Sequence, residues 1–224
     1  MGLFRGALAI RRYRIVDPPS SKNKADLRRK LEKGAVAHHF VAVDPKGESD
    51  RAMGWVAIDD LDVTELGDER IFGGAGQSEV RIALRIDRLV APPIEVKRQL
   101  AHKTAVLESS RGKPISRTEK KNLKLQIERA LRSKVFPQTR IHDLVWDLDA
   151  GTVLFWGQTK KAEESLIELF GKSFGLQLEI DGPSRWANQL LGAEALGKLE
   201  PAPELWQGFA DVRPLSHVVT GEDE

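Results

Sequence analysis

The segment from Pro92 to Arg140 is the feature that most constrains what this chain can fold into. It holds thirteen Lys or Arg against four Glu, a local net charge of +9, although the whole 224-residue chain carries only +2. Apolar residues recur at helical spacing on both sides of Arg111-Gly112-Lys113-Pro114. This turn ends a helix, because Gly supplies a left-handed cap and Pro cannot continue a helix. The segment therefore predicts two basic helices, one over about 94–109 and one that begins at Ser116.

The second of these helices opens with a capping-box sequence, Ser116-Arg117-Thr118-Glu119, in which the Ser and Glu side chains each accept a backbone N–H. Leu123, Ile127 and Leu131 follow at helical spacing and predict a face that packs on a core. Exposed helices normally interleave Glu with Lys, so the shortage of acids favours a surface that binds a polyanion. The alternative is that these charges only keep two surface helices solvated.

The composition narrows the class of protein further. The absence of Cys excludes disulfides, thiolate metal sites and a cysteine nucleophile. No apolar run reaches the length of a membrane span, and residues 1–10 are too short, and too interrupted by Arg5, for a signal peptide. We therefore expect a cytoplasmic protein. Residues 1–34 form a second positive region of +7, whereas 41–90 and 141–224 carry −5 and −9.

Alternating apolar and polar residues predict strands joined by tight turns. The clearest strand spans 79–87, with Val80, Ile82 and Leu84 on one face, which the basic hairpin is expected to cover. The other predicted strands span 4–15, with an irregularity near Arg11-Arg12, and 36–43, 53–58, 144–147, 152–156 and 176–180. Two further helices are predicted over 21–33, ended by Gly34, and from Thr159 to Phe170. This mixture is typical of an α+β protein with antiparallel sheets.

We divide the chain into four parts on these grounds. They are an α+β part with a basic N-terminus (1–91), the basic helical hairpin (92–140), a ββαβ part (141–180) and an acidic segment containing Pro and Gly (181–224). In the last part, Trp186 and Trp206 are expected to pin the chain to the body, and residues 221–224 to fray.

Three groups of residues suggest chemistry but have simpler explanations. The Gly-rich segment Gly73–Ser78 lacks the Gly-Lys-Ser/Thr ending of a phosphate-binding loop and precedes a strand, so it predicts a flexible turn. His38-His39 would alternate across a strand and so not share a metal ion. Asp143, Asp147 and Asp149 are compatible either with a divalent ion or with the polar face and turn of a hairpin.

A nuclease pattern is also present. Asp87, followed by Glu95-Val96-Lys97, imitates the signature in which carboxylates hold Mg²⁺ and Lys steadies the attacking water. That signature needs Glu and Lys on a strand, whereas Pro92-Pro93 and helical periodicity surround them here. A metal-dependent nuclease is therefore the alternative and not the first choice.

Several short motifs occur in a fixed order along residues 3–180. They are Phe4 to Tyr13-Arg14-Ile15, Met53-Gly54-Trp55-Val56, Ile94 to Lys103, Gly112 to Lys124, Val135-Phe136, Trp146-Asp147 with Gly151, Lys160-Lys161-Ala162-Glu163 and Gly171-Lys172-Ser173-Phe174-Gly175. In this order they resemble the RdgC family of bacterial recombination-associated proteins. The resemblance implies horseshoe subunits that dimerise into a ring with a basic interior.

The same resemblance implies a non-enzymatic, nucleoid-associated protein without a cofactor. Such a protein binds duplex DNA without sequence preference and restrains RecA-dependent strand exchange. The implied and candidate DNA-binding residues are Lys97, Arg98, Lys103, Arg111, Lys113, Arg117, Lys120, Lys121 and Lys124, with Arg11 and Arg12. Family members continue past the point where this chain stops, so we expect a shortened member and an open clamp.

Two further expectations concern partners. A homodimer is expected to pair strand 79–87, or the hairpin between Trp146 and Trp156, across a two-fold axis. A protein-interaction module, in which the basic hairpin docks on an acidic partner, remains the third alternative.

Overall fold

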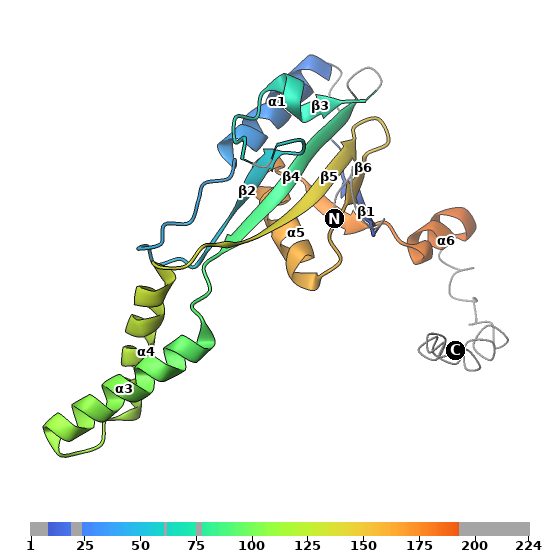
Figure 1. The fold of residues 1–224 in the computed structure, drawn as a ribbon. Helices are drawn as coiled ribbons and strands as arrows, with labels where there is room; N and C mark the ends of the chain where they lie inside the picture. Colours follow the sequence, from blue (N-terminus) through green and yellow to red (C-terminus); the bar gives the residue numbers. More distant parts are fainter. Residues whose placement is uncertain (1–8, 19–23, 61, 75–77, 193–224) are drawn as a thin grey trace, which may run out of the picture. The chain divides into compact units, whose positions relative to one another are not determined.

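The computed structural model of the chain describes residues 9–18, 24–60, 62–74 and 78–192 (Figure 1). The chain divides into two compact units, Met1–Ile180 and Asp181–Glu224, and each is treated by itself. The strands of the first unit are β1 (Arg11–Val16), β2 (Arg51–Ala57), β3 (Phe72–Gly73), β4 (Glu79–Arg88), β5 (Gln138–Asp147), β6 (Thr152–Phe155) and β7 (Gln177–Ile180). Its helices are α1 (Lys24–Ala37), α2 (Asp68–Ile71), α3 (Pro93–Arg111), α4 (Arg117–Arg132) and α5 (Lys160–Phe174).

All the strands in the described residues belong to one antiparallel sheet, which confirms the α+β class. The order is β2-β4-β5-β6-β1-β7, and β3 pairs with β4. Strand 79–87 and the 146–156 hairpin therefore lie inside the sheet, each paired on both sides, and neither offers a free edge. The expectation that they pair across a two-fold axis is wrong for that reason.

Helices α1 and α5 pack on one face of the sheet and close the main core (Figure 1). The largest fully buried side chains of this core include Trp55, Trp146, Tyr13, Phe155 and Phe170. Val80, Ile82 and Leu84 of β4 point into it, as the alternation predicted. The sequence assigned this covering role to the basic hairpin, and that assignment is wrong.

The basic hairpin instead has a small core of its own. Val96 of α3 packs against Ile127 and Leu131 of α4, with Leu100 and Leu123 partly buried beside them. The two helices lie side by side and extend from the end of the β4–β5 ribbon, where Arg88 pairs with Gln138 (Figure 1). The buried apolar residues of the hairpin join its two helices to each other, and so they are not available to cover a sheet.

Helix α1 continues past Gly34 to Ala37, so Gly34 does not end it as predicted. A Cβ on Gly34 would lie 2.2 Å from the carbonyl oxygen of Ser173 in α5, so Gly permits close helix contact here instead of capping. The strand predicted over 36–43 is reduced to a bridge between His39 and Trp55.

The first strand also differs from its prediction. β1 runs without a break from Arg11 to Val16, so the described residues show no irregularity at Arg11-Arg12. The part of this prediction that falls on residues 1–8 lies outside the described residues, as do residues 75–77 of the predicted Gly-rich turn.

The opposite face of the sheet carries charges that pair with each other. Arg81 binds Glu79 at 2.6 Å, and Arg85 binds the buried Asp87 at 3.1 Å. The Arg85 guanidinium also lies over the Phe40 ring, 4.4 Å from its centroid. The hydrogen bonds of Asp87 and Asp62 raise the pKa of Arg85, against the effect of burial.

The second unit contains helix α6 (Pro183–Leu191). The indole N–H of Trp186 donates to Asp181 at 2.8 Å, while Trp206 lies outside the described residues. In the described part of the chain, no helix combines the length and the apolar character that crossing a membrane requires.

Candidate nucleic-acid interface

The turn between α3 and α4 is built as the sequence predicted. Gly112 caps α3 in the left-handed conformation, with φ of 65°, and its N–H donates to the Glu108 carbonyl. Ser116 caps α4: its hydroxyl accepts the Glu119 N–H at 3.2 Å, and Glu119 accepts the Ser116 N–H at 2.9 Å. These local bonds position the first turns of α4 with their cations.

Four cations of α4 share one side of the helix. We call Arg117, Lys120, Lys121 and Lys124 the α4 cation row; all four are exposed. At 3.6 residues per turn they fall within about 100° of the helix circumference. Ile127 and Leu131 lie further along the helix, at angles that overlap the edge of this arc, and are buried in the hairpin core. The α4 cation row is therefore held on a helix whose orientation the hairpin core sets.

The cations of α3 do not form such a row. Lys97, Arg98 and Lys103 project from three different sides of the helix, because at 3.6 residues per turn their positions in the sequence do not fall on one side. Lys113, in the turn, is exposed. Of the cations predicted to meet phosphate, the structure brings together those of α4 and leaves those of α3 dispersed.

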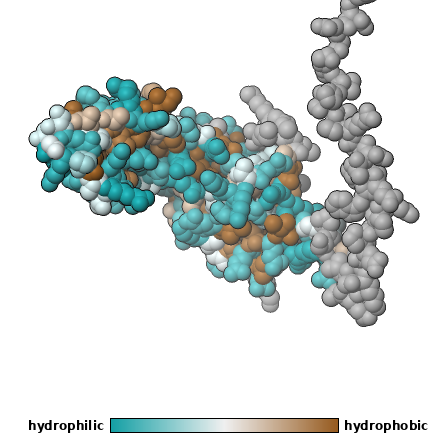
Figure 2. Space-filling view, turned by 90° about the horizontal axis from the view of Figure 1, so that it is seen from below, coloured by the Kyte–Doolittle hydropathy of each residue, from teal (hydrophilic) through white to brown (hydrophobic). Residues whose placement is uncertain are grey.

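The acids of the hairpin neutralise only three of its cations. Glu95 binds Arg98 at 2.7 Å, Glu119 binds Arg111 at 2.6 Å, and Lys124 lies 3.6 Å from Glu128. Within the described residues, the other ten Lys and Arg of the segment form no ion pair with a carboxylate. The excess positive charge is therefore presented to solvent, and Figure 2 shows the hairpin, at its left, as a mostly hydrophilic surface.

Arg11 and Arg12 lie on opposite faces of the sheet, since successive strand residues alternate. Arg11 forms an ion pair with Glu163 and donates to the Gln158 carbonyl at 3.2 Å, which ties β1 to α5. Arg12 is exposed on the other face. The structure thus does not bring these two arginines to one surface.

The residues of the nuclease pattern are placed differently from what that chemistry needs. Asp87 is 1% exposed and paired with Arg85, whereas Glu95 and Lys97 are in α3. Two residues apart on a helix, Glu95 and Lys97 project from nearly opposite sides. Hydrogen bonds from Arg98 and then Gln99 lower the pKa of Glu95 to about 2. In this arrangement Glu95 serves as an ion-pair partner.

The remaining candidates have local structural roles. Asp147 accepts the N–H groups of Asp149 and Ala150, and Asp149 binds Lys24 at 2.9 Å. His38 and His39 each place Nδ1 near a carbonyl of the last turns of α1, at 3.2 and 2.8 Å. Across the described ranges, no three His, Asp or Glu side chains are grouped as a metal ion would require.

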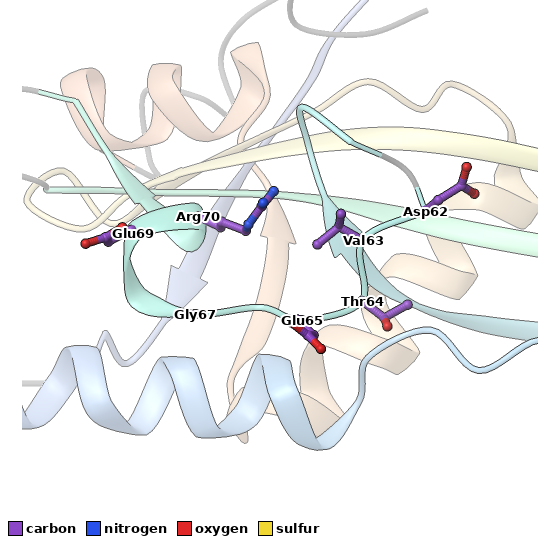
Figure 3. Close-up of a pocket in the computed structure, with 7 residues that line it drawn as sticks. All are labelled: Asp62, Val63, Thr64, Glu65, Gly67, Glu69 and Arg70. Carbon is purple, nitrogen blue, oxygen red and sulfur yellow. The ribbon is translucent and has the colours of Figure 1, made fainter.

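The segment of residues 62–70, which includes the start of α2, borders a hollow of about 580 Å³. Asp62, Glu65 and Glu69 line it together with Arg70, and their carboxylates point in different directions (Figure 3). An acidic lining repels phosphate, so this hollow does not extend the candidate interface. A second cavity, at the base of the hairpin, is lined by cations that come from four separate elements, and no local sequence signal predicts it.

Comparison with known proteins adds one finding. The model of the family described as "Putative exonuclease, RdgC" matches residues 10–183, and no curated protein matches the chain. This match spans β1 to β7 and includes the whole basic hairpin. At the level of the family, it supports a DNA-binding role related to recombination.

Proposed function

The chain belongs to the RdgC family, and from this premise we propose that it binds duplex DNA without sequence preference through the phosphate backbone. The observation that carries the proposal is the α4 cation row, four exposed cations within one side of a helix in a segment of net charge +9. Lys and Arg that meet phosphates release condensed counterions, and this contribution does not depend on the bases.

Assembly is part of the same proposal. Two copies would place two basic hairpins around one duplex, as a ring or an open clamp. On the described part of the hairpin, Ile94 and Phe136 are 85% and 93% exposed, which supports an apolar contact between copies. Light scattering at micromolar concentration tests this: the expected mass is two chains, and a single-chain mass with and without DNA contradicts the clamp.

We further propose a cellular role in restraining RecA-type recombination, in the cytoplasm and on the nucleoid. This role follows from duplex binding, because a protein that occupies the duplex without sequence preference competes with strand exchange. The check is a strand-exchange assay with a RecA-type recombinase. Inhibition is expected for the wild-type chain and should weaken when the α4 cation row is removed.

A nuclease is the second candidate, because the description of the family names an exonuclease. Incubation of plasmid and of linear duplex with the protein and Mg²⁺ tests it directly. The proposed binding function predicts no strand cleavage. Cleavage that disappears in Glu95→Ala would establish the nuclease pattern instead.

The test of the main proposal is a duplex titration across salt concentration. If about six phosphates are neutralised, the slope of log Kobs against log salt is near −5. Two unrelated sequences of equal length should give the same affinity. A slope near zero, or a strong preference for one sequence, contradicts binding through the backbone.

A further inference from the structure

The cavity at the base of the hairpin is a second cationic site, separate from the α4 cation row. It encloses about 460 Å³ between the ends of β4 and β5 and the first turns of α5. Arg51, Arg88, Arg140 and Lys161 line it, as does His142, and these residues come from β2, β4, β5 and α5. A volume of this size is within the range of small-molecule sites.

Each acid that lines the cavity has an ion-pair partner. Asp50 pairs with Arg88 at 3.4 Å. Glu164 and Glu168 pair with Lys160 and Lys172, which belong to the same helix but do not line the cavity. Arg51, Arg140 and Lys161 then remain, and within the described residues none of them forms an ion pair with a carboxylate. With Arg88, the lining has four Lys or Arg against three acids, so the cavity carries a net charge of +1.

Two of the polar groups are held in place by the fold. The guanidinium of Arg51 donates to the buried Ser165 hydroxyl at 2.6 Å, and this hydroxyl in turn donates to the Lys161 carbonyl. The ring of His142 has Nδ1 3.0 Å from the Trp156 carbonyl; a carbonyl only accepts, so Nδ1 is the donor of this bond, which fixes the ring.

Helix α5 adds to the positive electrostatic potential of the cavity. Thr159 caps it and accepts the Ala162 N–H at 3.2 Å, so the first turn of a 15-residue helix opens at the cavity. The N-terminal end of a helix favours anions. Guanidinium groups are well suited to phosphate oxygens because their N–H groups match them in pairs.

We propose that this cavity binds a phosphomonoester, supplied either by a nucleoside monophosphate or by the terminal phosphate of a DNA strand. Arg51, Arg140 and Lys161 contact the phosphate oxygens. The cavity shares no residue with the α4 cation row, so this binding does not rest on the proposed duplex function. It adds a site that recognises one phosphate group, whereas the hairpin recognises a backbone.

Calorimetric titration of the full chain in EDTA with dAMP and with deoxyadenosine tests whether the protein recognises a phosphomonoester group. The nucleotide should bind at least about tenfold more tightly, as charge-assisted hydrogen bonds to the phosphate require. Duplexes with 5′-phosphate and 5′-hydroxyl ends distinguish the source: a preference for the phosphorylated duplex identifies a strand end, and binding of dAMP alone identifies a free nucleotide.

Two sets of variants make the test specific. Arg51→Ala with Lys161→Ala changes exposed residues that have no carboxylate partner and lie outside the segment 92–140, and this double variant should lose the preference for phosphate while it keeps its affinity for long duplex. Alanine at Lys120, Lys121 and Lys124 should do the reverse. The proposal is overturned if neither ligand pair shows a preference for the phosphate, or if the folded double variant keeps that preference in full.

Discussion

The guanidinium of Arg111, in the last turn of α3, donates to the carboxylate of Glu119, in the first turn of α4, over 2.6 Å. The other oxygen of this carboxylate accepts the backbone N–H of Ser116. One carboxylate thus joins the end of α3 to the start of α4. Arg111, which the sequence suggested as a DNA contact, is partly neutralised by this bond, and the α4 cation row is held by the same turn.

This arrangement gives a pH prediction. The Ser116 backbone N–H, followed by Arg111, lowers the pKa of Glu119 from 4.5 to about 2. Because the folded pKa is below the unfolded one, Glu119 stabilises the hairpin above pH 4.5 and this stabilisation is lost as the pH falls toward 2. NMR titration of the Glu119 carboxyl should show a midpoint near 2. In Arg111→Gln the midpoint should rise but stay below 4.5, since the Ser116 bond remains; a wild-type midpoint near 4.5 contradicts the capping geometry.

Gly34→Ala should destabilise the protein, although Ala is the better helix former by up to about 1 kcal/mol. The added Cβ would lie 2.2 Å from the backbone oxygen of Ser173, so α1 and α5 must move apart. Gly171→Ala is the matched control, because Gly171 also lies in α5. Its added Cβ would meet only the backbone oxygen of Leu176, at an ordinary contact distance of 3.8 Å. Denaturant unfolding should give a lower midpoint for the first variant and an equal or higher one for the second. Equal stabilisation by both changes would exclude the close contact.

Ile127→Ala should loosen the hairpin and leave the sheet intact. Ile127 is fully buried between α3 and α4, and truncation of a buried Ile costs roughly 2–5 kcal/mol. The hairpin core is separate from the main core, so we expect local unfolding. Hydrogen exchange should accelerate over residues 93–132 and stay unchanged in β4 and β5. Leu84→Ala, in the main core, is the comparison and should accelerate exchange throughout the sheet. If Ile127→Ala accelerates exchange in the sheet as much as Leu84→Ala does, the hairpin and the sheet unfold as one cooperative unit, which contradicts the prediction.

Replacing Lys120, Lys121 and Lys124 together with Ala should weaken duplex binding equally for all sequences and flatten its salt dependence. The free energy of unfolding should change by less than about 1 kcal/mol, because exposed charges contribute little to it. Arg29, Lys30 and Lys33 of α1 are also exposed and allow a control triple variant with the same change in charge. If the α1 variant loses the affinity and the α4 variant retains it, the DNA surface is on the basic N-terminal region.

Local patterns determined a large part of this protein. The Gly112 cap, the capping box at Ser116 and the alternation of Val80, Ile82 and Leu84 all follow from the residues themselves, and all are confirmed. Each depends on hydrogen bonds or periodicity within a few residues, and such interactions form wherever the segment is placed. The net charge of the hairpin could also be obtained from the sequence, because it is the sum of the charged residues in the segment.

Tertiary structure alone decided what these elements contact. It determined that α1 and α5, and not the basic hairpin, cover the sheet, and that Gly34 lies against Ser173 instead of ending a helix. It also brought Arg51, Arg140 and Lys161, which are far apart in the chain, to one cavity. A sequence pattern records which face of an element is apolar, but the partner of that face is chosen by the packing of the whole chain.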